Sequence, residues 1–137
     1  MTAFQFLKLY AATAAVFFAL DLTWLGVVAK GFYKAQMGHL MRPDTQWIPA
    51  VLFYLVYVAA IIVLCVKPGL ERESMGRAVA MGAVFGLAAY AAFDLTSLAL
   101  LKDFPLKVAL VDLAWGTSVT AAVSGASYAI GRAMQLG

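Results

Sequence analysis

Three aspartates stand inside long apolar stretches, where an ionised side chain is costly. Asp21 lies in FALDLTWLG, Asp94 in AAFDLTSLA and Asp112 in VDLAWGT. A charged aspartate at the centre of a membrane helix costs about 2.5–3.5 kcal/mol on insertion scales, so such residues normally face a bundle interior or a watery cavity. These residues could therefore bind a proton, a cation or a polar group, or they could form a polar clamp that holds helices together.

The neighbours of these aspartates are hydrogen-bond donors. Trp24 and Trp115 each follow an aspartate by three residues, on roughly the same helix face, and an indole N–H can donate to a carboxylate. Tyr90 precedes Asp94 by one helical turn. Carboxylates that lie close together cannot all ionise, so we expect at least one to hold a proton near neutral pH. The predicted ligand-binding residues are Asp21, Trp24, Tyr90, Asp94, Asp112, Trp115 and Gly116.

The composition requires a lipid environment for these groups. The chain has 137 residues, of which 64% are hydrophobic and 12% charged, with a mean hydropathy of +0.89. Soluble domains are nearer half apolar and a quarter charged. Apolar stretches long enough for a transmembrane helix cover about 9–28, 47–66, 78–101 and 108–130. We predict an all-α, four-transmembrane-helix bundle that forms a single integral membrane domain over residues 1–137.

The depth of the aspartates in their spans predicts that they share one layer. Asp21 and Asp94 lie seven residues before the end of the first and third spans, and Asp112 lies four residues after the start of the fourth. The first and third spans end on the side of the membrane where the fourth begins. The two Asp-Leu-Thr-x-Leu copies are also 73 residues apart in spans of the same direction, which suggests two parallel helix-hairpin repeats. Chance recurrence of Leu and Ala is the alternative explanation.

Small residues predict which spans pack closely. Gly82 and Gly86 form a Gly-x-x-x-Gly face in the third span, and Gly116, Thr120 and Ser124 recur at every fourth residue in the fourth. We therefore expect these two spans to be in tight contact.

The second span is bulky, with Phe53, Tyr54 and Tyr57, and is expected to be the most lipid-exposed. Residues 31–41 between the first two spans are expected to form a short interfacial helix, and residues 67–77 a charged turn.

Several kinds of site are not supported by the sequence. A single cysteine, Cys65, and a single histidine, His39, cannot form an internal disulfide or the usual zinc and haem sites. No metal site is predicted, and cofactors and catalytic residues stay unassigned. The basic residues lie at the ends of apolar segments, where they contact lipid headgroups, so we expect the lipid bilayer and no nucleic acid as a partner. They divide five against five between the two sides, which leaves the membrane orientation open.

The segments DLTWLG and FDLTSLALLKDFPLKVALVDLAWGT, together with the four-span layout, resemble a bacterial family known as domain of unknown function 2177. The resemblance covers nearly the whole chain and implies a multi-pass protein of the bacterial inner membrane. It transfers no reaction. This chain has Ser97 and Phe104 where the family pattern tends to have Asn and Trp, so neither side chain receives a role. The resemblance draws attention to Asp21, Trp24, Asp94, Pro105, Asp112, Trp115 and Gly116.

Three functional hypotheses follow from these residues. The leading one is a small membrane protein that binds a cation, a proton or a lipophilic small molecule at the Asp/Trp layer, with coupling to transport as an extension. Four helices make a thin wall for a pathway, so transport would need a homodimer. The second hypothesis is a membrane enzyme that uses a protonated aspartate as general acid on a lipid or isoprenoid. The third is a structural accessory subunit of a larger membrane complex.

Overall fold

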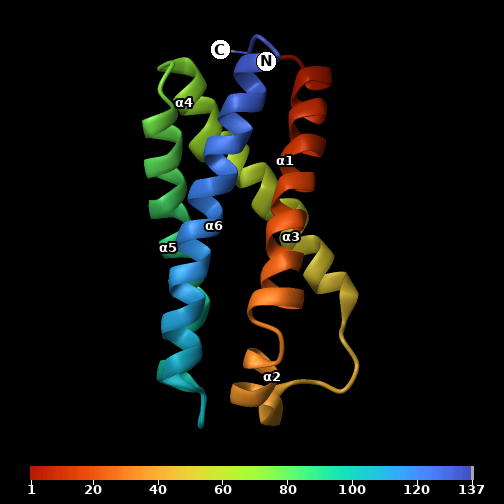
Figure 1. Cartoon of the computed structure of the whole chain (residues 1–137), viewed down its shortest axis with the longest axis vertical. Helices are drawn as coiled ribbons and strands as arrows, with labels where there is room; N and C mark the ends of the chain where they lie inside the picture. The colour runs from red at the N-terminus through yellow and green to blue at the C-terminus, as the bar shows by residue number, and fades with distance from the viewer. Residues whose placement is uncertain (137) are drawn as a thin grey trace.

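Long helices dominate the computed structural model, which describes residues 1–136 (Figure 1). Four helical segments are long and apolar enough to cross a membrane: Ala3–Val28, Trp47–Glu71, Met75–Leu100 and Leu106–Ala133. Both termini lie at one end of the molecule, and the short helix α2 lies at the other (Figure 1). The predicted all-α fold with four membrane-spanning helices is confirmed.

The helices begin at residues that satisfy their free backbone N–H groups. α1 (Ala3–Thr23) starts earlier than expected because Thr2 and Gln5 form a reciprocal capping box. In α5 (Met75–Leu100), the Ser74 side chain accepts from the backbone N–H of Arg77. α6 (Leu106–Ala133) follows Pro105, which closes the short connection from α5.

The second membrane-spanning segment runs further than expected. α3 (Trp47–Ile61) continues through a π-helical turn, Ile62–Val66, into α4 (Lys67–Glu71), so Lys67–Glu71 is helical rather than part of a turn. A proline inside a helix lacks an N–H, and its ring clashes with the carbonyl four residues earlier. The π-helical turn directly precedes Pro68 and widens the helix at that point, which relieves the clash.

α5 and α6 form the tightest contact in the molecule, as predicted. A Cβ added to Gly82 would lie 2.4 Å from Ser124 Oγ, and one added to Gly86 would lie 2.4 Å from the carbonyl oxygen of Gly116. Only glycine permits so close an approach of two helix backbones. By contrast, α1 and α3 touch over a short stretch only. The duplication of helix hairpins stays a prediction, and the two halves pack differently.

The prediction that the second span is the most lipid-exposed is wrong. In an apolar stretch of 18 residues within that span, 28% of the residues are buried, whereas the corresponding share in the first span is 17%. α3 crosses the other helices obliquely (Figure 1), so its first half is exposed and its second half packs in the core. Tyr57 is buried there, and its hydroxyl lies 2.8 Å from Thr120 Oγ1.

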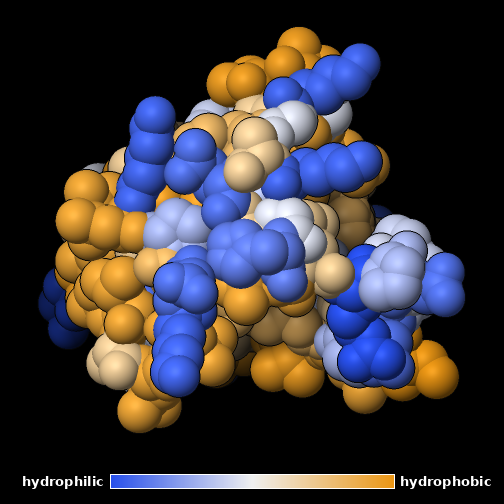
Figure 2. Space-filling model, turned by 90° about the horizontal axis from the view of Figure 1, so that it is seen from below, coloured by the Kyte–Doolittle hydropathy of each residue, from blue (hydrophilic) through white to orange (hydrophobic). Residues whose placement is uncertain are grey.

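The end opposite the termini carries the connections. As expected, residues 31–41 contain a short helix, α2 (Phe32–Met37), which is followed by a 3₁₀ turn at Gly38–Leu40. His39 Nε2 lies 3.0 Å from the backbone oxygen of Asp103, so the connection after α2 contacts the α5–α6 turn. Hydrophilic side chains gather across this end, and hydrophobic ones surround them (Figure 2). This distribution suits an end at the membrane–water interface.

Candidate functional site: an acidic aromatic cleft

Asp21 lies on the inner face of α1, 7% exposed, and receives two hydrogen bonds from other helices. Tyr54 Oη, from α3, donates to Asp21 Oδ2 at 2.7 Å. Trp115 Nε1, from α6, donates to Asp21 Oδ1 at 3.2 Å. Donors from two neighbouring helices therefore stabilise a carboxylate that lipid alone would not solvate.

Asp112, on α6, is contacted from the connection after α1. Gly31 adopts a φ of +80°, a left-handed conformation that glycine accepts at low cost, and the chain turns there into α2. This turn places Tyr33 so that its Oη donates to Asp112 Oδ1 at 3.0 Å, while Trp24 Nε1 donates to Tyr33 Oη at 3.1 Å. Burial raises the pKa of the Tyr33 phenol above its usual value, although the bond from Trp24 acts in the opposite direction. The phenol therefore keeps its proton at physiological pH and donates a hydrogen bond to Asp112.

The two indoles join these hydrogen-bonded groups. Trp24 and Trp115 stack with ring centroids 4.6 Å apart and an angle of 7° between the planes. Neither indole donates to the aspartate of its own helix, which the three-residue spacing had suggested. Instead, Trp115 bonds to Asp21 across the bundle, and Trp24 reaches Asp112 through Tyr33. Asp21 and Asp112 are thus connected by one continuous set of aromatic contacts.

Asp94, on α5, is fully buried and differs from the other two aspartates. Neither of its carboxyl oxygens has a hydrogen-bond partner within the described residues. Burial of a carboxyl group without a partner is costly, and the cost is larger for its ionised form. Asp21 and Asp112 both accept hydrogen bonds, so Asp94 is the aspartate that the surrounding side chains leave unsatisfied.

A cleft of about 220 Å³ opens between these side chains. Its wall contains two carboxyl groups, from Asp21 and Asp112, and no Lys, Arg or His. A second hollow, of about 300 Å³, lies on the other side of Tyr90 and also reaches Asp112. The cleft is lined by Asp21, Trp24, Leu25, Tyr33, Tyr54, Tyr90, Asp112 and Trp115.

Two of the residues predicted from the sequence lie behind the cleft rather than in its wall. They are Asp94, which is buried, and Gly116, which lies so close under the Tyr90 ring that an added Cβ would be 2.2 Å from Tyr90 Cγ. The structure brings the other predicted residues together around the cleft, and their binding role stays a prediction. The predicted residues in the wall are Asp21, Trp24, Tyr90, Asp112 and Trp115.

Sequence reasoning missed Tyr33 and Tyr54, the two phenols that bond to the carboxylates. The available signal was chemical, because a tyrosine hydroxyl inside an apolar span needs a hydrogen-bond partner. Tyr54 was instead counted among bulky lipid-facing residues. Within the described residues there is no cluster of three or more His, Cys, Asp or Glu side chains that could hold a metal ion.

Comparison with known proteins places this architecture in a family. No curated protein and no solved structure matches the chain. The family described as "Predicted membrane protein (DUF2177)" matches residues 6–129, which include all three aspartates, both stacked indoles and nearly the whole of the four spans. The chain therefore belongs to the DUF2177 family of predicted membrane proteins.

Proposed function

We propose that this membrane protein binds a small organic cation in the cleft between Asp21 and Asp112, in competition with protons. The observation that carries the proposal is the composition of the cleft wall. It combines two carboxyl groups with aromatic rings and contains no basic side chain. A site of this kind attracts positive charge and rejects anions.

The aromatic rings favour an organic cation over a bare metal ion. Trp24, Trp115, Tyr33, Tyr54 and Tyr90 all line the cleft, and the face of an aromatic ring attracts a cation within about 6 Å of its centroid. Such contacts contribute about 0.5–2 kcal/mol each, with the larger values in desolvated sites. Metal ions such as Mg²⁺ and Ca²⁺ prefer a shell of oxygen ligands, whereas alkylammonium ions are recognised by aromatic cages.

Cation binding in the cleft competes with protons. A cation beside Asp112 favours the ionised form of that carboxyl, so a proton and a cation compete for the same group. Cation affinity should therefore rise with pH. Asp94 is fully buried and does not line the cleft, so a role for it as general acid on a ligand there is not supported.

The cellular setting and assembly are part of the proposal. The resemblance to a bacterial family supports a location in the bacterial inner membrane. Exchange of a proton for a cation across that membrane would need a homodimer, since four helices alone form a thin wall around the cleft.

Binding can be measured through the cleft tryptophans. The Trp47→Phe background removes the exposed tryptophan and leaves Trp24 and Trp115 as reporters. Purified protein in mild detergent is titrated with choline and, as a neutral molecule of the same shape, with 3,3-dimethyl-1-butanol. We expect choline, and not the neutral alcohol, to quench the tryptophan fluorescence in a saturable way. Its affinity should fall as the pH is lowered, because protons compete for the carboxyl groups.

Matched aspartate variants identify the site. Asp21→Asn and Asp112→Asn should each weaken choline binding at least about five-fold, because a charge pair about 4 Å apart contributes roughly 1–4 kcal/mol between bulk water and a protein surface. Asp103→Asn, in the α5–α6 turn, removes an aspartate outside the cleft and should bind like the parent. If choline and the alcohol quench the tryptophan fluorescence equally, the carboxylates form only a polar clamp between helices. The same conclusion follows if both cleft variants bind choline like the parent.

A further inference from the structure

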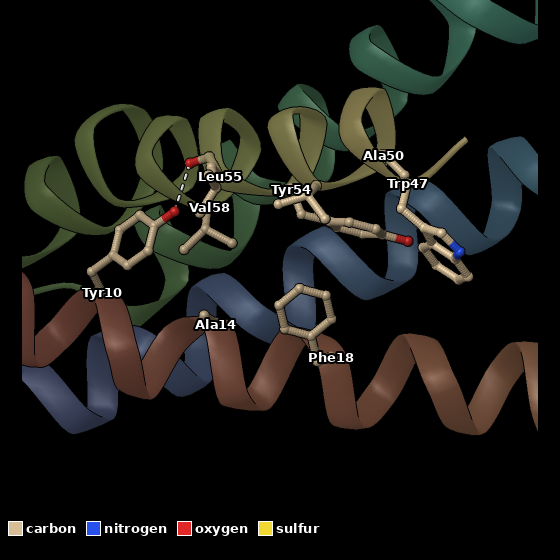
Figure 3. A pocket seen from close by; sticks show the side chains of 9 residues that line it. Tyr10, Ala14, Phe18, Trp47, Ala50, Tyr54, Leu55 and Val58 are labelled. Carbon is tan, nitrogen blue, oxygen red and sulfur yellow. Dashed lines mark hydrogen bonds between the residues drawn. The ribbon is translucent and has the colours of Figure 1, made fainter. Parts of the chain in front are cut away.

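The cleft shares one lining residue, Tyr54, with a further hollow, which is apolar and lies on the side of the molecule. This α1–α3 groove has a volume of about 150 Å³ and lies between α1 and the first half of α3 (Figure 3). Ala14 and Ala50 leave it open, because their methyl groups are too small to fill the space between the two helices. The groove is lined by Tyr10, Ala14, Phe18, Trp47, Ala50, Val51, Tyr54, Leu55 and Val58.

Tyr54 separates the α1–α3 groove from the acidic cleft and belongs to both. Its hydroxyl bonds to Asp21 in the cleft, while its ring faces the groove and packs against Phe18 with centroids 5.0 Å apart. In Figure 3 the Tyr54 ring lies between the α3 ribbon and the Phe18 side chain of α1. One side chain, Tyr54, therefore lines both the ionic site and the apolar site.

The two ends of the groove limit what fits there. At one end the Tyr10 hydroxyl donates to the backbone oxygen of Leu55 at 2.7 Å, which bridges α1 and α3 (Figure 3). At the other end lies Trp47, the first residue of α3, on the side of the hydrophilic end of the molecule. The groove is thus a short apolar hollow that could hold part of an apolar chain, with the Tyr10–Leu55 hydrogen bond at one end.

We infer that the natural ligand is an amphiphilic cation, whose charged head lies in the acidic cleft and whose apolar chain lies in the α1–α3 groove. This inference rests on the proposed function, and it adds a substrate class and a specificity-determining groove. The occupant is the ligand's own chain, because the groove adjoins, across the Tyr54 side chain, the cleft whose charge the head complements. A lipid acyl chain that fills the groove independently is the competing outcome.

A chain-length series tests the inference. Binding of tetramethylammonium, butyltrimethylammonium and octyltrimethylammonium is measured by titration calorimetry on the protein with Trp47 intact, in detergent below the micelle-forming concentration of the ligands. Each methylene that enters an apolar site from water raises affinity about four-fold. Ligand partition into detergent also rises with chain length, so the decisive quantity is the octyl-to-tetramethyl affinity ratio compared between variants.

Ala14→Leu and Ala50→Leu fill the groove and leave the cleft carboxylates in place. We expect each to lower the octyl-to-tetramethyl ratio at least ten-fold, with tetramethylammonium affinity unchanged within about two-fold. Ala11→Leu adds the same side chain to an exposed position of α1 outside the groove and should keep the parent ratio.

The outcomes separate the inference from the proposed function. If tetramethylammonium binds through Asp21 and Asp112 but the ratio is equal in all variants, the chain does not use the groove and the inference fails alone. Equal losses for short and long ions in the groove variants also overturn it, because the substitutions then act on the fold. If no trimethylammonium ion binds in a way that depends on the cleft aspartates, the proposed function fails first.

Discussion

Replacement of Gly86 by alanine should push α5 and α6 apart and lower the free energy of unfolding. A Cβ at this position would lie 2.4 Å from the carbonyl oxygen of Gly116, 2.7 Å from Thr120 Cβ and 2.8 Å from Thr120 Oγ1, whereas ordinary contact begins at 3.4 Å. The first of these atoms is backbone and cannot rotate away, so the helices must separate by about 1 Å at this point. Overpacking of this kind costs about 1–3 kcal/mol. The better helix propensity of alanine returns about 0.5–1 kcal/mol, which leaves a net loss of roughly 1–2 kcal/mol.

Gly76→Ala is the matched control on the same helix. A Cβ there would meet only Ser74 Oγ, at 3.8 Å, so the substitution should be neutral or stabilising by up to about 1 kcal/mol. The free energy of unfolding of both variants is measured by circular dichroism in mixed micelles with increasing SDS. A Gly86→Ala protein that is as stable as Gly76→Ala would refute the reasoning, because the close contact would then have no energetic consequence.

Two further substitutions test contacts around the cleft. Tyr57→Phe removes the hydroxyl that lies against Thr120 and should lower the free energy of unfolding by about 0.5–1.5 kcal/mol in the same SDS assay; an unchanged value would mean that lipid or another group compensates Thr120. Trp115→Phe removes the donor to Asp21 and weakens the stack on Trp24, so choline affinity measured by calorimetry should fall about two- to thirty-fold, the range expected for one cation–π contact. A Trp115→Phe protein with parental affinity would exclude the indole from the site.

The sequence was sufficient for the parts of the structure that depend on local patterns. Continuous apolar runs predict the four helices, because only closed backbone hydrogen bonding is tolerated in lipid. The four-residue spacing of Gly82 and Gly86 predicts the α5–α6 contact, since the spacing and the packing face are both properties of one helix. The depth of Asp21, Asp94 and Asp112 along their spans could be counted in residues. The structure places Asp21 and Asp112 in the wall of one cleft, and Asp94 is buried outside that wall.

Contacts that depend on how helices are rotated and tilted could not be predicted in this way. Tyr54 reaches Asp21 over 33 positions of sequence, and Tyr33 reaches Asp112 over 79. α3 is apolar on every side, so its sequence does not show which face is inside, and its oblique path buries Tyr57 where bulk alone suggested lipid. For the same reason Trp24 and Trp115 are each linked to the aspartate of the other helix, Trp24 through Tyr33 and Trp115 directly. Helical spacing shows only which residues share a face and does not show which residues of another helix that face meets.

The donors that surround Asp21 have a consequence for how long a ligand stays. Tyr54 and Trp115 already donate hydrogen bonds to this carboxylate, so an ion of the proposed kind must replace two existing bonds. That replacement lowers the net affinity, and the two side chains can bond to the carboxylate again when the ion dissociates. The proposed transport would need a complex brief enough for turnover. These two hydrogen bonds favour such a short-lived complex over a permanent one.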